Sequence, residues 1–216
     1  MTLYFIDENR REEHIYLDHD DECFYIYGEH IARAGYAASP TNQLISNIKK
    51  EVSKRGTPEY FYKERDIIQV ANLVKEALGN DVLPITVIPV PPSKAKDDPE
   101  YDNRILLCLG EIIKDGWDVR ELIVAKASMR AHHEHQSGEK RPTPDELYQM
   151  LMIDETCFSQ KPIQQKIILF DDVLTNGTHF KACKRLLLER LPESKVYGLF
   201  IARTIHLCPF SEILDT

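Results

Sequence analysis

IILFDDVLTNGTHFKACKRLL, residues 167–187, begins with four apolar residues in a row. An unbroken apolar run of this kind is typical of a β-strand buried on both faces, as in a parallel sheet. Two acids, Asp171 and Asp172, follow it, and a short polar turn covers 175–178. The apolar residues after the turn recur with helical spacing. The stretch therefore predicts a strand, a tight turn and a helix that begins at about Thr178.

Each part of this stretch suits a phosphorylated sugar. The free backbone N–H groups at the start of a helix attract phosphate, and Gly177 lets the chain approach an anion closely. The hydroxyls of Thr175 and Thr178 can donate hydrogen bonds to phosphate oxygens. The two adjacent carboxylates can accept from the hydroxyls of a vicinal diol, so we expect a ribose 5-phosphate here. The expected contacts of its phosphate are Val173, Leu174, Thr175, Asn176, Gly177 and Thr178.

Strand and helix patterns alternate from residue 85 onward. The apolar runs that predict strands cover 85–90, 121–124, 166–170 and 195–201. Helical patterns start at Asp98 and at Thr178. This alternation predicts an α/β fold with a central, mostly parallel sheet flanked by helices. Ligands bind beyond the carboxyl ends of the strands in such sheets, so the loops that follow the strands are the candidate sites.

The first 30 residues predict a small antiparallel β element. Aromatic and β-branched residues gather in three short runs, LYFI, HIYL and CFYIY, which lie at 3–6, 14–17 and 23–27. Clusters of Asp, Glu and Asn separate these runs, as in strands joined by turns.

Two helical patterns follow the β element. Thr41 or Asn42 can cap the first helix. The basic residues over 49–55 are expected on a solvated helix face, and contact with an anionic partner is the alternative. The second, longer helix stops before residue 80. We therefore divide the chain into an N-terminal accessory region, 1–80, and a core, 81–216.

Composition limits the class of protein. The chain has 216 residues, with 27 Lys and Arg against 35 Asp and Glu, which gives a net charge of −8. This acidity argues against non-specific binding of nucleic acid. No apolar run approaches the roughly 20 residues of a membrane span, and the N-terminus does not resemble a secretory signal. Five cysteines without a CxxC pair argue against a zinc ribbon and a disulfide framework. We expect a cytoplasmic protein.

Other motifs share features with the 167–187 stretch. An apolar run that ends in Asp-Asp also occurs in the metal-binding strand of P-loop ATPases, but no GxxxxGK[ST] precedes it here. A haloacid dehalogenase nucleophile requires Asp-x-Asp, and a dinucleotide fold requires GxGxxG; the sequence has neither pattern at the required place. A parallel strand whose acids only cap the next helix stays open as a purely structural alternative.

The segment 167–178 resembles the motif with which type I phosphoribosyltransferases bind 5-phosphoribosyl 1-pyrophosphate (PRPP). That motif has four apolar residues, two acids, two mostly apolar residues and a Thr/Gly-rich turn. Asn176 stands where the family has its second Thr, and His179 where many members have the last Thr of the turn. PVP at 89–91 and TNQLISNIKK at 41–50 are similar to the ComF-like branch. The resemblance implies the type I phosphoribosyltransferase fold in the core, with a mobile hood loop.

The resemblance also implies that the loop after the first core strand contacts pyrophosphate. This loop reads PVPPSKAK over 89–96. Its expected contacts, together with a later arginine, are Pro92, Ser93, Lys94 and Arg104, of which the basic side chains would neutralise the anion. The alternative is a Pro-rich solvent loop with ordinary surface lysines.

The family's hood corresponds to residues 126–144 of this chain. In the resembled family a hood closes over PRPP and shields the reaction from water. Lys126 and Arg130 are our candidates for stabilising the leaving pyrophosphate. The same segment contains His132, His133 and His135. Their HHxH spacing is not the i, i+4 spacing of zinc ligands on a helix, so a solvated loop or a hood role is the better interpretation.

The implied reaction is displacement of pyrophosphate from C1 of PRPP by a nitrogen nucleophile. Asp171 and Asp172 would hold the ribose hydroxyls, and Mg²⁺ would be bound mainly through the pyrophosphate of PRPP. We expect no set of metal ligands from the protein itself. The expected ligand is PRPP or a ribonucleotide 5′-phosphate; the acceptor and a homo-oligomeric state stay open. The alternative function is a non-catalytic sensor, or a partner protein in DNA uptake or mobile-element defence.

Overall fold

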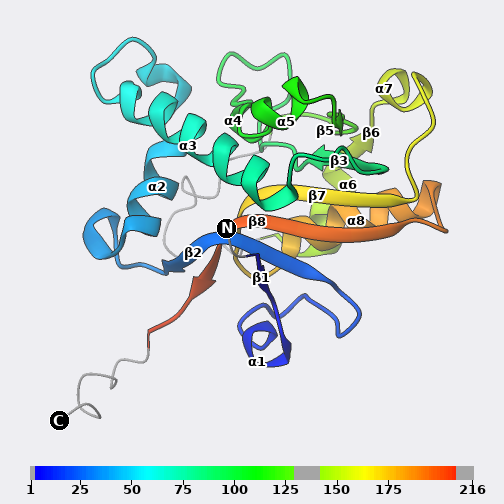
Figure 1. Cartoon of the computed structure of the whole chain (residues 1–216), viewed down its shortest axis with the longest axis horizontal. Coiled ribbons are helices and arrows are strands. Elements are labelled where there is room, and N and C mark those ends of the chain that lie inside the picture. The colour runs from blue at the N-terminus through cyan, green and yellow to red at the C-terminus, as the bar shows by residue number, and fades with distance from the viewer. Residues whose placement is uncertain (1–2, 129–141, 208–216) are drawn as a thin grey trace.

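The structure is a computed structural model that describes residues 3–128 and 142–207 (Figure 1). Its centre is a six-stranded sheet in which β1 and β2 pair antiparallel and the other neighbouring strands pair parallel. In spatial order the strands are β1 (Tyr4–Phe5), β2 (Cys23–Ile31), β8 (Lys195–Ile205), β7 (Lys166–Leu174), β3 (Ile85–Pro89) and β4 (Asp118–Val119). The described chain is therefore α/β with a mostly parallel central sheet, as predicted.

Helices cover both faces of this sheet (Figure 1). One face carries α2 (Pro40–Ile48), α3 (Tyr60–Leu78), α4 (Arg104–Leu107) and α5 (Gly110–Lys114). The other face carries α6 (Pro144–Met150), α7 (Glu155–Ser159) and α8 (Thr178–Arg190). The remaining short elements are α1 (Glu8–Arg11) and the 3₁₀ turns η1 (Tyr36–Ala38) and η2 (Val52–Lys54).

The apolar residues of β7 separate these two helical layers. Ile167 and Leu169 pack into the core beneath α8, whereas Ile168 and Phe170 pack into the core beneath α2 and α3. All four are at most 8% exposed. This alternation explains the unbroken apolar run, because successive side chains of a strand point to opposite faces and both faces of β7 are covered.

The direction in which the chain crosses the sheet changes between β3 and β7. From β3 the chain passes to β4 at one edge, and it returns to β7 on the other side of β3 before it continues to β8. In open α/β sheets, ligands bind beyond the carboxyl ends of the strands at such a switch point. The loops after β3 and β7 border this position.

Residues 121–124 do not form a strand of the central sheet, so this prediction is wrong. The short β4 occupies the sheet edge, and β5 (Ile123–Ala125) pairs antiparallel with β6 (Leu151–Ile153) in a separate two-stranded sheet. The buried Arg120 lies between β4 and β5. Its guanidinium donates to the carbonyls of Lys161 at 2.7 Å and Pro162 at 2.8 Å, which ties this turn to the segment before β7. The apolar residues of 121–124 predicted a strand, but they did not indicate which strand it would pair with.

The small antiparallel β element predicted over residues 1–30 is confirmed only in part. Residues 14–17 form a turn, and only the two residues of β1 pair antiparallel with β2. β2 pairs in parallel with β8 and so belongs to the central sheet. Because α2 and α3 share a core with β7 and β8, the first 80 residues form part of the same layered fold as the described residues after them.

The helices at 60–78 and 178–190 are present as predicted. Two other helices begin at residues that differ from the predicted ones. α2 is capped by Ser39, whose Oγ accepts from the N–H of Asn42 at 3.0 Å, rather than by Thr41 or Asn42. The helix predicted from Asp98 begins only at α4. The carboxylate of Asp98 accepts from the N–H of Glu100 at 2.8 Å, and such local side-chain contacts favour a turn over a helix.

No described helix is long and apolar enough to cross a membrane. The described cysteines have free thiols, and Cys23, Cys108 and Cys183 are buried among apolar side chains. These three thiols therefore behave as small core residues.

Gly28 of β2 lies in close contact with α2. A Cβ atom at this position would lie 2.7 Å from Thr41 Oγ1 of α2. We expect Gly28→Ala to lower the free energy of unfolding by about 1–3 kcal/mol, because the helix must shift to relieve the overlap. Urea denaturation measures this loss.

Gly110→Ala is the matched control, since no atom lies within 4 Å of its added Cβ, and it should leave stability almost unchanged. Thr41→Ala should restore part of the loss in the Gly28→Ala background. A loss that persists unchanged in the double variant would contradict the steric explanation.

Candidate ligand site at the carboxyl ends of β3 and β7

The loop between β7 and α8 forms a tight turn. β7 ends at Leu174, and α8 begins at Thr178 directly after Gly177. Gly177 has a φ of 89°, a left-handed conformation that favours glycine, and an added Cβ would lie 3.0 Å from a methyl group of Leu17. The side-chain oxygen of Asn176 accepts from the N–H of Thr178 at 3.2 Å and from its hydroxyl at 2.9 Å. A polar side chain thus occupies the position where the helix start could hold an anion.

Residues 14–21, which we call the N-terminal strap, support this loop from the outside. The imidazole Nδ1 of the fully buried His14 contacts the carbonyl oxygen of Thr175. The N–H of Tyr16 donates to the carbonyl of Asn176 at 3.0 Å. Sequence analysis did not connect the strap with the loop because 161 residues separate His14 from Thr175, and no local pattern predicts such a contact.

The two acids of the motif have different surroundings. Asp172 lies on the face of β7 that α2 covers, where it is 4% exposed. It pairs with Lys49 Nζ at 2.9 Å and with Arg104 Nη2 at 2.8 Å. Asp171 accepts from the backbone N–H of Asp172 at 2.7 Å, and it lines the large cavity at this end of the sheet. Asp171 is therefore the carboxylate open to a ligand, whereas Asp172 is already ion-paired.

Electrostatics separates the two carboxylates further. Burial and the adjacent charge of Asp172 raise the pKa of Asp171 to about 7. Burial would also raise the pKa of Asp172, but Lys49 and Arg104 together lower it well below its usual range. Near neutral pH the site therefore holds one firmly ionised carboxylate and one that is partly protonated.

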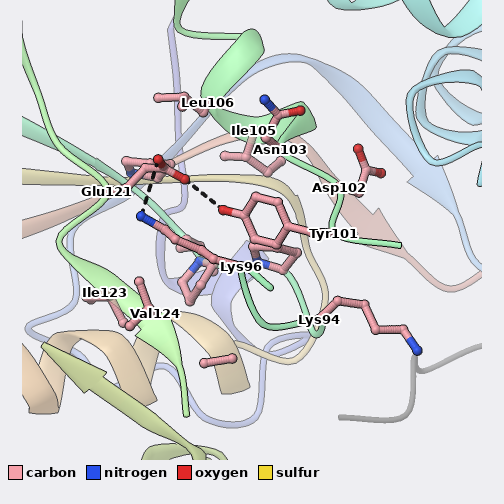
Figure 2. A pocket seen from close by; sticks show the side chains of 15 residues that line it. Lys94, Lys96, Tyr101, Asp102, Asn103, Ile105, Leu106, Glu121, Ile123 and Val124 are labelled. Atoms are coloured by element: carbon pink, nitrogen blue, oxygen red, sulfur yellow. Dashed lines mark hydrogen bonds and ion pairs between the residues drawn. The ribbon is translucent and has the colours of Figure 1, made fainter. Parts of the chain in front are cut away.

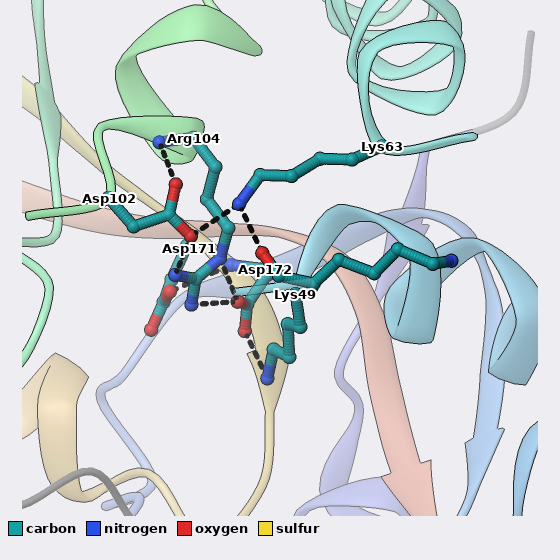
Figure 3. Close-up of polar contacts among 7 residues, drawn as sticks. Lys49, Lys63, Asp102, Arg104, Asp171 and Asp172 are labelled. Carbon is teal, nitrogen blue, oxygen red and sulfur yellow. Dashed lines mark hydrogen bonds and ion pairs between the residues drawn. The ribbon is translucent and has the colours of Figure 1, made fainter. Parts of the chain in front are cut away.

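A chain of buried and partly buried charges extends from Asp172 to α3 (Figure 3). Arg104 Nη1 contacts the carboxylate of Asp102 at 3.0 Å, and Asp102 accepts from Lys63 Nζ at 2.7 Å. The side chain of Lys63 is 1% exposed, and its Nζ also donates to the carbonyl of Lys50 at 2.7 Å. This network ties α3 and the residues after α2 to the strand that carries the two acids.

The loop after β3 is anchored beside the sheet by a second set of polar contacts (Figure 2). The hydroxyl of Tyr101 donates to Glu121 at 2.7 Å, and Lys96 Nζ lies 3.5 Å from the same carboxylate. Lys94 points away from these residues, and its Nζ lies 3.6 Å from Glu100. Both lysines of the loop therefore have carboxylate partners in the structure.

A cavity of about 1130 Å³ opens at the carboxyl ends of β3 and β7. Residues after both strands and residues at the end of α2 form its walls. The predicted ligand contacts that it brings together are Pro92, Ser93, Arg104, Asp171, Thr175, Asn176 and Thr178. Its volume exceeds the roughly 300–1,000 Å³ of an ordinary small-molecule pocket, so there is room for more than a ribose 5-phosphate.

The remaining predicted contacts do not line this cavity. Those among the described residues are Lys94, Lys126, Asp172, Val173, Leu174 and Gly177. Val173 and Leu174 are buried in β7. Lys126 is exposed, and its Nζ donates to a backbone carbonyl of α6 at 2.8 Å. Arg130 and the three histidines of the predicted hood lie outside the described residues.

Sequence analysis missed the basic residues at the end of α2. Lys49, Lys50 and Lys54 line the cavity, although 49–55 was expected on a solvated face. They reach the cavity because α2 packs against β2 and ends at the carboxyl end of the sheet. This position agrees with the alternative, contact with an anionic ligand. Only the adjacent lysines themselves gave a signal, and that signal is common on exposed helices.

A scan of the chain against protein-family models finds no match, and a search of curated proteins finds no similar sequence. The chemistry of the site therefore rests on the geometry of these residues.

The buried network predicts unequal roles for two lysines of α3. Lys63→Met should lower the free energy of unfolding by about 3 kcal/mol, because buried acceptors lose a charged donor. Lys75 is the matched control: its Nζ lies 2.8 Å from Asp115, but both side chains are partly exposed, so Lys75→Met should cost far less. Urea denaturation compares them, and equal losses would show that burial of the network does not matter.

The burial of His14 should make the free energy of unfolding depend on pH. Burial lowers the pKa of His14 below 6.5, although its contact with Thr175 acts in the opposite direction. Its Nε2 is buried and has no hydrogen-bond partner among the described residues. Because the unfolded chain then binds the proton more readily, stability should be fully present above pH 6.5 and decline as pH falls below it.

Denaturation from about pH 7.5 to about pH 5 checks this dependence. His14→Gln keeps an N–H donor for the carbonyl of Thr175 but cannot titrate, so its stability should vary less with pH over this range. His19→Gln, at an exposed position of the same strap, should behave like the parent. Parallel curves for His14→Gln and the parent would rule out His14 as the cause.

Proposed function

We propose that the chain has the type I phosphoribosyltransferase fold and binds PRPP, or a ribonucleotide 5′-phosphate, at the switch point between β3 and β7. One observation carries the proposal: Asp171 and the turn before α8 line the same cavity. A carboxylate near the end of a parallel strand suits the diol of a ribose, and a helix start a few residues later suits its 5-phosphate.

In this proposal the 5-phosphate takes the place of the Asn176 side chain. Two donors of Thr178, its N–H and its hydroxyl, now bind the side-chain oxygen of Asn176. A charged phosphate oxygen is a stronger acceptor for both of them, and the dipole of α8 favours negative charge here. The hydroxyl of Thr175 lies 3.4 Å from the same oxygen of Asn176 and supplies a third donor.

In this proposal Asp171 accepts hydrogen bonds from the ribose hydroxyls, and Asp172 is a residue that positions Lys49 and Arg104. Asp172 holds Lys49 and Arg104, both of which line the cavity. These two cations are the proposed contacts of pyrophosphate, together with Ser93 of the loop after β3. Asp171 offers a hard oxygen ligand beside them, a type that suits Mg²⁺, but most ligands of the ion would come from pyrophosphate and water.

The inferred reaction is a substitution at C1 of the ribose. The lone pair of an acceptor nitrogen forms the C1–N bond while the C1–O bond to pyrophosphate breaks, and pyrophosphate leaves with the bonding electrons. The proton of the acceptor nitrogen passes to pyrophosphate or to water. Lys49 and Arg104 would stabilise the negative charge that develops on the leaving group.

A non-catalytic sensor is the second candidate function. It is favoured by the positions of two lysines that were expected to assist the leaving group. Lys94 pairs with Glu100, and Lys126 donates to a backbone carbonyl. A site with this arrangement could bind a nucleotide without promoting transfer, for example in a partner protein for DNA uptake or mobile-element defence.

Calorimetric titration of the full chain with PRPP, with and without Mg²⁺, tests the proposed ligand. A screen of nitrogen bases for PRPP-dependent release of pyrophosphate then separates an enzyme from a sensor. If neither PRPP nor ribose 5-phosphate binds, both candidate functions fail.

The affinity for ribose 5-phosphate should depend on the carboxylate of Asp171. We expect Asp171→Asn to weaken ribose 5-phosphate about tenfold and inorganic phosphate much less, because only the sugar donates to this side chain. The affinity of the parent for ribose 5-phosphate should rise as pH increases through about 7, where Asp171 ionises. The Asn variant should lack that rise.

Inorganic phosphate, titrated over the same pH range, controls for ionisation of the ligand phosphate itself, whose pKa is about 6. Asp172→Asn is the matched variant, and it should mainly lower stability because Lys49 and Arg104 lose their shared carboxylate. Equal weakening of both ligands by Asp171→Asn would mean that Asp171 does not hold the ribose.

A further inference from the structure

The cavity extends beyond the proposed ribose 5-phosphate site to the segment between β2 and α2. His30, Arg33 and Tyr36 of that segment line it, as do Lys50 and Lys54 after the end of α2. We call these five residues the distal compartment. The proposed contacts of ribose, 5-phosphate and pyrophosphate use none of them.

The segment that carries Arg33 is held in an unusual backbone conformation. Arg33 has a φ of 60°, in the left-handed region that non-glycine residues rarely adopt. The 3% exposed Asn42 holds the turn: its amide donates to the carbonyls of Ile31 at 2.9 Å and Gly35 at 3.0 Å. Its side-chain oxygen accepts from the N–H of Ile31 at 2.9 Å. Strained residues that buried neighbours hold in place are concentrated at ligand sites, and here the strain places an arginine at the cavity.

The positive charge of the distal compartment is not fully neutralised. Lys54 Nζ lies 3.4 Å from Glu59, and Glu59 and Glu51 also line the cavity. Within the described residues, no carboxylate pairs with Arg33 or Lys50. Lys50 Nζ lies 5.6 Å from the ring centroid of Tyr62 and also contacts the side-chain oxygen of Asn47. Its described partners are therefore neutral. Arg33, Lys50 and Lys54 outnumber Glu51 and Glu59, the glutamates that line the cavity with them, in a chain with a net charge of −8. This local excess of positive charge favours an anionic ligand.

The neutral members of the compartment indicate that this ligand also has an aromatic ring. The side chain of Tyr36 is half exposed and lines the cavity, so its ring face can stack on a planar group. Burial and the nearby Lys49 lower the pKa of His30, which leaves a neutral imidazole beside the two cations at neutral pH. A guanidinium of Arg33 can bind a planar anionic group with two parallel hydrogen bonds.

We propose that the distal compartment binds an aromatic anion, and that the acceptor in the proposed transfer is an aromatic nitrogen compound that carries a carboxylate or phosphate group. The identity of this ligand as the acceptor rests on the proposed function. Binding of an aromatic anion at this place does not, since it requires neither PRPP nor Mg²⁺.

Benzoate and benzamide are matched probes, because they have nearly the same shape and differ in charge. We expect the full chain to bind benzoate about tenfold more tightly than benzamide, as measured by ligand-observed NMR titration. Phenyl phosphate, titrated in parallel, shows whether the compartment prefers a carboxylate or a phosphate. Arg33→Asn with Lys50→Gln should reduce the affinity for benzoate to that for benzamide; asparagine is chosen because it tolerates the left-handed conformation.

Lys114→Gln is the control variant, since Lys114 is an exposed lysine of α5 that pairs with Glu111, and it should leave benzoate binding unchanged. The double variant should also keep the affinity of the parent for ribose 5-phosphate, which shows that it is folded. The proposal is overturned if the parent binds benzoate no better than benzamide, or if the double variant keeps its benzoate affinity. Binding of benzoate without any binding of ribose 5-phosphate would instead reject the proposed function and leave the aromatic-anion site in place.

Discussion

The ion pairs of one buried carboxylate organise the candidate ligand site. Asp172 lies between Lys49 and Arg104, so a single side chain of β7 holds the end of α2 and the start of α4. Transfer of such charges out of water is costly, and buried ion pairs are weak contributors to stability. Their effect here is geometric: they place two cations at the cavity and leave Asp171 as the carboxylate that a ligand can reach.

The same network gives the cavity its electrostatic character. Its cations are Lys49, Lys63 and Arg104, and its acids are Asp102 and Asp172, of which Asp172 has a lowered pKa. Burial and the charge of Asp172 raise the pKa of Asp171, which favours its neutral form, while Lys49 and Arg104 line the cavity as cations. A small anion that enters the cavity therefore meets these two cations.

Contacts between distant segments support the turn before α8 in the same way. The N-terminal strap lies against the turn through His14 and is joined to α8 through the buried Asp21, whose carboxylate contacts Lys181 at 2.8 Å and Lys184 at 2.5 Å. The turn is therefore held from both sides, by β7 and by the strap. Such support lowers the entropy lost when a ligand orders the loop.

The sequence alone determined the strand–turn–helix unit around Asp171. An unbroken apolar run requires cover on both faces, and Gly177 permits the left-handed turn that begins α8, so both features follow from local geometry. The tertiary structure decided which acid lines the cavity, the position of β5 outside the central sheet, and the inclusion of Lys50 in the cavity wall. Local sequence limits backbone angles and burial, but it does not specify which distant residue will face a given side chain. The partners of Asp172 therefore emerge only when α2, α4 and β7 pack together.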